Sequence, residues 1–303
     1  MIKTLRKIIT VVLFLVPVVF ISCFFLYPIT AILWNGLQSQ DHLNQLTEVL
    51  RAPRSQKAIW FTFWQATIST VITILVALPS AALISKMKKR SRKWVRAAIT
   101  VPFVLPTIVV AGAFEAVFKQ LGIDRGPLSL HHTSWAIILA HVFFNYAVVA
   151  RTVGSFWSGL DYRVEEQARL LGANKWQAFW QVTFPALKPA IYASAVITYL
   201  FSFTSFGIIL VLGGPRKATL ETEIYRYAIT RSDFQSASSL ALLQLIAVLL
   251  LIIVSTRLER GKPAPKSISY GSSEQFSLKF RLTNWTFVSM FLGGPILTLF
   301  LRS

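Results

Sequence analysis

The chain has 303 residues, of which 54% are hydrophobic and only 14% are charged. A water-soluble domain carries about 25% charged residues, so the composition excludes an ordinary soluble globule, and the many aromatic and β-branched residues exclude a disordered chain. The single cysteine, Cys23, excludes an intrachain disulfide and a cysteine-built metal site. The net charge of +19 is by itself compatible with a protein that binds nucleic acid. However, the basic residues lie between long apolar stretches, which indicates an integral membrane protein with the lipid bilayer, and no nucleic acid, as its partner.

Seven apolar stretches are long enough to cross a membrane as helices, because about 20 residues span the hydrocarbon core. They cover residues 8–34, 58–84, 97–118, 134–156, 190–212, 237–256 and 284–301. The first stretch follows three basic residues, as in a signal peptide, but it is too long for a signal core and lacks a small-residue cleavage site. We therefore expect an uncleaved first span and an all-α, polytopic membrane protein. Pro102 and Pro106 are expected to bend the third span.

The basic residues predict the orientation of the chain. With the N-terminus in the cytoplasm, most of the 31 lysines and arginines fall in the inner segments. The densest run extends from Lys86 to Arg96. This run could bind nucleic acid or a lipid headgroup. Alternatively, it anchors the loop against the anionic leaflet of the membrane, which is the favoured interpretation.

The inner loop 157–189 carries signals for two short helices. Asp161 can cap a first helix that runs to about Leu171, with Gly172 as its left-handed end. Asn174 and Gln177 predict a capping box at the start of a second helix.

Two prolines and a face of small residues complete this loop. Pro185 is expected to stop the second helix, and Pro189 to lie at the start of the fifth span. Ala168 and Gly172 share a face of the first helix. Small residues beside charged ones leave a surface that another protein can approach closely, whereas a helix resting passively on headgroups would favour leucine or aromatic residues.

The loop resembles the EAA loop of permease subunits of binding-protein-dependent ABC importers. The resemblance rests on Glu166-Gln167-Ala168-Arg169-Leu170-Leu171-Gly172-Ala173, followed by Phe179, Val182, Phe184, Pro185 and Pro189. Gln167 replaces the first alanine of the motif, and Phe184 replaces the usual leucine. The resemblance implies a coupling helix that seats in a groove of a cytoplasmic ATPase subunit. The implied coupling residues are Glu165, Glu166, Ala168, Arg169, Gly172, Ala173 and Pro185.

Other stretches resemble the thiamine and ferric-ion permease branch of this family. They are residues 140–146 and 203–207, and the Leu-Gly-Gly-Pro at 212–215, which leans towards thiamine. Many members of that branch fuse two permease halves. We accordingly expect a six-span half at 1–256, a cytoplasmic linker at 257–283, and a seventh span at 284–303 that resembles the first span of a second half. The chain would then be a fragment, a truncated product or a genuine seven-span subunit.

The resemblance implies a six-helix type I importer core plus the seventh span, in the cell inner membrane. Its partners would be two ATPase subunits, a second permease half or homodimer mate, and a solute-binding protein. The chain has no glycine-rich phosphate loop, so ATP and Mg would be bound by the ATPase, and we expect no catalytic residue and no cofactor here.

Thiamine is the favoured solute, with ferric ion, phosphonate and polyamine as alternatives. An ion-coupled secondary transporter is disfavoured because Glu115 is the single acidic residue inside a predicted span. A membrane scaffold without transport activity is a further alternative.

Residues of the fourth and fifth spans are candidates for the translocation path. Asn145 either forms an interhelical hydrogen bond or contacts the solute. Phe201, Thr204, Ser205 and Phe206 form either a helix-packing surface or a cavity wall for a solute in transit. His131 and His132 lack the rest of a ligand set, so no metal site is expected.

Overall fold

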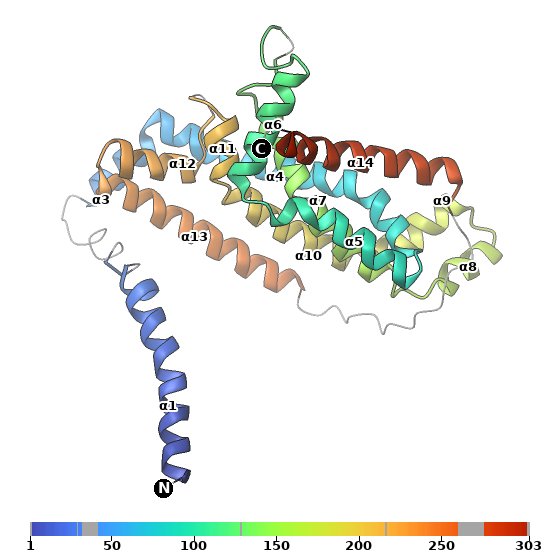
Figure 1. Cartoon of the computed structure of the whole chain (residues 1–303), viewed down its shortest axis with the longest axis horizontal. Coiled ribbons are helices and arrows are strands. Elements are labelled where there is room, and N and C mark those ends of the chain that lie inside the picture. The colour runs from blue at the N-terminus through green and yellow to red at the C-terminus, as the bar shows by residue number, and fades with distance from the viewer. Residues whose placement is uncertain are drawn as a thin grey trace. The chain divides into compact units, whose positions relative to one another are not determined.

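The computed structural model describes residues 2–28, 30–31, 42–127, 129–215, 217–259 and 276–301, which form helices and loops without a strand among them. The predicted all-α class is confirmed. Figure 1 shows the helices: α1 (Ile2–Ile21), η1 (Ser22–Leu26), α3 (His42–Arg51), α4 (Pro53–Ser85), α5 (Lys89–Val104), α6 (Thr107–Gln120), α7 (Ser134–Trp157), α8 (Arg163–Leu170), α9 (Lys175–Ala178), η2 (Phe179–Thr183), α10 (Phe184–Phe203), α11 (Gly207–Leu212), α12 (Leu220–Tyr225), η3 (Arg226–Thr230), α13 (Phe234–Glu259) and α14 (Leu278–Phe300).

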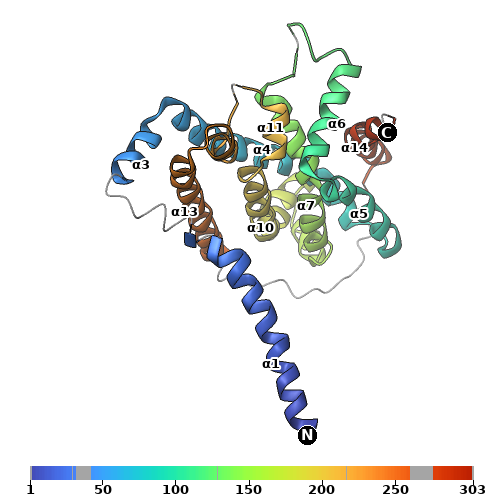
Figure 2. The same ribbon diagram turned by 60° about the vertical axis from the view of Figure 1, so that its left-hand side comes forward.

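Six spans can be assigned in the described part of the chain. Five helices are long and apolar enough to cross a membrane, at Pro53–Ser85, Ser134–Trp157, Lys175–Phe203, Phe234–Arg257 and Leu278–Phe300. The pair α5 and α6, which is bent by 93° between Val104 and Thr107, is a sixth if it crosses as one broken helix; Figure 2 shows the change of direction. These six correspond to the predicted spans after the first. Within the first predicted span, Thr10–Leu26 is a shorter apolar helix, and residues 29 and 32–34 lie outside the described residues.

The chain divides into two compact units. One comprises Met1–Gln56 and Glu223–Ala247. Its helix α1 has exposed apolar side chains on all sides from Val11 onward, which suits a helix surrounded by lipid. In the same unit, Arg54 pairs with the buried Glu223.

The other unit comprises Lys57–Thr222 and Val248–Ser303 and contains the main apolar core. Its α7 is the most buried of the five long spanning helices and lies between α5 and α10 (Figure 2). Helix α14 packs against α6 and α5. Helix α14 also reaches α4, where Asn284 Nδ2 donates to Ser80 Oγ over 2.7 Å, and Tyr146 of α7 donates to the same hydroxyl.

The fifth predicted span differs from the structure at both ends. Pro185 does not stop a helix, because the chain continues from α9 through the π-helical turn η2 into α10, and Pro189 lies inside α10. Proline is tolerated in a spanning helix where a local π-turn re-satisfies the freed backbone groups. At its other end the span is broken at residues 204–206, between α10 and α11.

The seventh span begins earlier than predicted. Helix α14 starts at Leu278, because the Ser277 hydroxyl caps it by accepting from the Phe280 N–H over 3.3 Å. Most of the predicted linker, at 260–275, lies outside the described residues.

Candidate functional site

The loop between α7 and η2 presents the short helix α8, and both of its ends are closed by local hydrogen bonds. Asp161 Oδ1 accepts from the Arg163 N–H over 3.0 Å. At the other end, the Gly172 N–H bonds to the Arg169 carbonyl and the Ala173 N–H to the Ala168 carbonyl, both over 3.1 Å. Gly172 has φ +98°, a left-handed conformation that glycine adopts without strain. These two bonds form a Schellman motif, so the predicted helix end at Gly172 is confirmed.

The second short helix starts as predicted. Asn174 Oδ1 accepts from the Gln177 N–H over 2.8 Å, and Gln177 Oε1 accepts from the Asn174 N–H over 2.9 Å. This reciprocal capping box fixes the beginning of α9 at Lys175, three residues after Gly172. Two rigid helix ends therefore hold the connecting segment in place.

The adjacent residues Glu165 and Glu166 have different surroundings. Glu165 Oε2 accepts from Thr183 Oγ1 over 2.7 Å, and Thr183 is buried. Glu166 is exposed. Glu165 therefore attaches α8 to η2 and so to the spanning helix α10, while Glu166 is available to a partner.

The outer surface of α8 is apolar at its C-terminal end. Leu170 and Leu171 are 87% and 90% exposed, and Gly172 has open space where a Cβ would lie. Trp176 is exposed nearby in the sequence. We expected small and charged residues on this surface; the exposure of the two leucines was not predicted, although both lie inside the quoted motif. Exposed apolar side chains of this kind fit contact with another protein or with lipid headgroups.

An aromatic cluster beside the loop was also missed. Phe179 contacts Trp157, Trp176 and Phe184, with ring centroids 6.0, 6.3 and 6.2 Å away. Trp180 lies 4.7 Å from Phe184. The spacing of three to four residues between these aromatics could have predicted that they share a helix face.

Four of the five candidate path residues lie at or beside the break between α10 and α11. Thr204, Ser205 and Phe206 form the break, and Phe201 lies one turn before it. A Cβ on Gly207, directly after the break, would be 2.6 Å from Thr107 Oγ1. Thr107 is the first residue of α6, so the break in the fifth span contacts the break in the third span.

Phe201 is 43% exposed and lies in an aromatic group with Phe103 and Phe144, at centroid distances of 5.3 and 6.1 Å. Asn145 has a different environment: it is fully buried and its Nδ2 donates to Ser202 Oγ over 3.3 Å. The structure thus shows the interhelical hydrogen bond for Asn145 and brings the other four residues together at the paired breaks.

The described residues contain no group of three or more His, Cys, Asp or Glu side chains that could hold a metal ion. Glu115 Oε1 lies 2.9 Å from Lys119 Nζ and 3.9 Å from His131 Nε2, so its charge is compensated locally. His132 has φ 57° and packs where a Cβ on Gly214 would lie.

Comparisons with known proteins agree with the fold. The family model for the binding-protein-dependent transport system inner membrane component matches residues 74–260. The molybdenum transport system permease protein ModB of Mycobacterium bovis is 30% identical over 223 residues, which are 70% of this chain and 83% of ModB. The thiamine transport system permease protein ThiP of Haemophilus influenzae is 29% identical over 233 residues, 74% of this chain, but the chain spans only 41% of that relative.

Among solved structures, a bacterial ABC transporter that imports the acidic polysaccharide alginate has a chain with the same fold. It superposes with a TM-score of 0.68 at 16% identity, over 85% of this chain and 97% of that chain. The chain belongs to the family of inner membrane components of binding-protein-dependent transport systems. It is a permease subunit of an ABC importer, and the predicted permease fold is confirmed.

Proposed function

We propose that α8 and the turn at Gly172 dock on a cytoplasmic ATPase subunit and couple ATP hydrolysis to solute import. The observation that carries the proposal is the open surface at Glu166 and Gly172, on a helix that Glu165 joins to η2 by a hydrogen bond. A soluble partner could approach closely there, and a helix with bonded ends would pass the partner's movement to α10. In this proposal the N-terminus is cytoplasmic and two ATPase subunits serve a pair of permease halves, the second being a homodimer mate or a separate half.

Energy enters through differential contact with two states of the ATPase. Closure of the ATPase pair on ATP would favour the outward-facing permease, which then receives solute from a binding protein. ATP and Mg stay on the ATPase, and Glu166, Gly172 and Ala173 act in this chain only as contact residues.

We further propose that the paired breaks form part of the solute path. Helices broken inside a membrane are tolerated where the irregular backbone is buried in protein or lines a cavity. Phe201, Thr204, Ser205 and Phe206 lie at such a break, next to Thr107. Asn145 would support the path from behind, through Ser202.

Thiamine is the first solute to test, followed by ferric ion, phosphonate and polyamine, and by molybdate because of the relative ModB. The Leu-Gly-Gly-Pro stretch that favours thiamine has a packing reason of its own. A Cβ on Gly213 would lie 2.5 Å from two carbonyl oxygens, and Gly214 has φ 62° and packs against His132. Uptake measurements with the matching binding proteins are therefore needed to identify the solute.

The coupling role is tested by co-purification of the tagged chain from native membranes, followed by solute-stimulated ATP hydrolysis in liposomes. Gly172→Leu should release the ATPase and abolish stimulation, as should Glu166→Lys. Gly122→Leu is the matched control, because Gly122 also has a positive φ (68°) and open space around it but lies in the loop after α6. Full stimulation in both loop variants, at equal membrane abundance, would contradict the proposal.

A further inference from the structure

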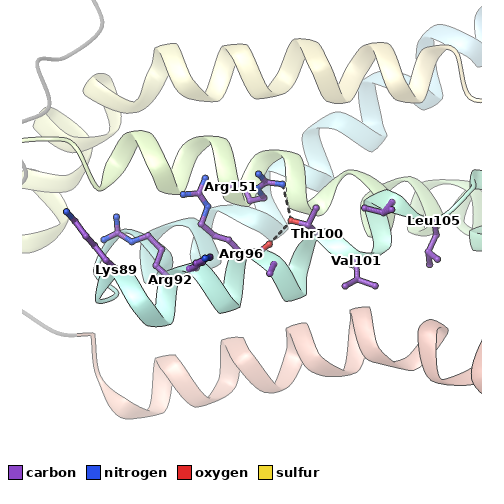
Figure 3. A pocket seen from close by; sticks show the side chains of 10 residues that line it. Lys89, Arg92, Arg96, Thr100, Val101, Leu105 and Arg151 are labelled. Atoms are coloured by element: carbon purple, nitrogen blue, oxygen red, sulfur yellow. Dashed lines mark hydrogen bonds between the residues drawn. The ribbon is translucent and has the colours of Figure 1, made fainter.

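A groove of about 800 Å³ runs along α5, and five cationic side chains line one end of it (Figure 3). Lys89, Arg92, Lys93 and Arg96 come from α5, and Arg151 comes from α7. None of the ten lining residues is acidic. Five like charges around one groove repel each other unless an anion lies between them.

The cations are placed by both helices. Residues 89, 92, 93, 96 and 100 recur at helical spacing and share one face of α5. Arg151 reaches across from α7, where its Nη1 donates to Thr100 Oγ1 over 3.0 Å, as the dashed line in Figure 3 marks. Anchoring to the anionic leaflet requires only positive charge in a loop, so it does not explain an arginine held at this position from a second helix.

Arg92 is held in the same groove by its backbone contacts. Its Nη2 donates to the carbonyls of Ser85 and Met87 over 3.0 and 2.7 Å. Its Nε is buried and has no hydrogen-bond partner within the described part of the chain. The two carbonyl contacts therefore hold the Arg92 charge at the wall of the groove, beside the other cations.

The opposite end of the groove is apolar. Ala97, Val101, Val104 and Leu105 continue the lining, and the Val104 side chain is 76% exposed. The groove thus has a cationic end and an apolar end along one membrane-embedded helix. A free inorganic anion would use only the cationic end, whereas a phospholipid matches both.

We propose that this groove binds an anionic phospholipid, with the headgroup phosphate at Arg96 and Arg151 and an acyl chain along Val101 and Val104. Arginine suits this role because its planar guanidinium pairs with two phosphate oxygens at once. The site is separate from the coupling loop and does not depend on its role.

The test is native mass spectrometry of the full chain in mild detergent, with phosphatidylglycerol or phosphatidylcholine of matched acyl chains. The groove variant is Arg96→Gln with Arg151→Gln. The control is Lys88→Gln with Arg90→Gln, which removes the same charge from exposed residues of the same basic run that do not line the groove. Thermal unfolding of each variant checks that it is folded.

We expect the wild type to prefer phosphatidylglycerol, the groove variant to bind it on the order of tenfold more weakly, and the control to change by no more than about twofold. Val104→Glu, at the exposed apolar end, should also weaken lipid binding and tests the site without touching the arginines. Equal losses in groove and control variants, or no preference between the two lipids, would overturn the proposal. So would complete displacement of the lipid by millimolar inorganic phosphate, which would assign the groove to a free oxyanion.

Discussion

Thr183 Oγ1 donates to Glu165 Oε2 over 2.7 Å and so joins α8 to the π-helical turn that leads into α10. The bond separates the roles of two adjacent glutamates, because Glu165 is turned towards the protein and Glu166 towards the surroundings. This bond links the short helix to the turn that continues into the spanning helix. In the coupling role that we propose, the link would pass movement of α8 to α10.

Glu165→Ala should loosen α8, because it leaves the buried Thr183 hydroxyl without its partner at a cost of about 1–3 kcal/mol. Glu165→Gln keeps an acceptor oxygen and should behave nearly as the wild type. The measurement is hydrogen exchange of the α8 amides in the purified protein. Equal protection in the alanine and glutamine variants would show that the hydrogen bond does not hold the helix.

Leu171→Ser should leave the stability of the subunit unchanged, since the side chain is 90% exposed. If the surface docks on the ATPase, the same change should weaken the complex by about 1–3 kcal/mol, as for an apolar residue at an interface centre. Thermal unfolding and a pull-down titration with the ATPase separate the two effects. Leu121→Ser, an exposed apolar residue directly after α6, is the control and should leave ATPase binding intact.

Gly207→Val should destabilise the paired breaks, because its Cβ would lie 2.6 Å from Thr107 Oγ1 and 2.9 Å from the Ile108 nitrogen. Overpacking of this kind costs about 1–3 kcal/mol. Gly293→Val is the matched control, since a Cβ there meets nothing within 4 Å. A lower melting temperature and loss of transport are expected for the first variant alone; an unchanged melting temperature would contradict the close contact.

Glu223→Ala should destabilise the unit that contains Arg54, because Glu223 is 1% exposed and bonds to Arg54 and Arg226, each over 2.8 Å. Burial of Arg226 disfavours its charge, but the hydrogen bond and charge of Glu223 outweigh this and raise the pKa of Arg226. We expect a loss of about 1–3 kcal/mol, less than for a fully buried pair, because Arg54 is half exposed. Arg125→Ala, in an exposed ion pair, should change the unfolding free energy by less than about 0.5 kcal/mol. Equal small effects in the two variants would show that the pair contributes no stability.

The sequence by itself determined the features that depend on neighbouring residues. Apolar length predicted seven spans, and the six after the first correspond to apolar helices or the bent helix pair of the described residues, because a helix inside a membrane must satisfy its own backbone. The caps of α8 and α9 were predictable because their hydrogen bonds are local. The bonds at Asn174, Gln177 and Gly172 join residues close together in the sequence. Of the two prolines expected to bend the third span, Pro106 lies at the bend, whereas Pro102 lies inside α5.

Tertiary structure alone decided which distant residues meet. It placed Glu165 against Thr183, Arg151 beside Thr100 on another helix, and Gly207 against Thr107. It also carried the helix through Pro185, where a local rule predicted a stop. Such contacts follow from the packing of whole helices against one another, and the order of residues along a single segment does not contain that information.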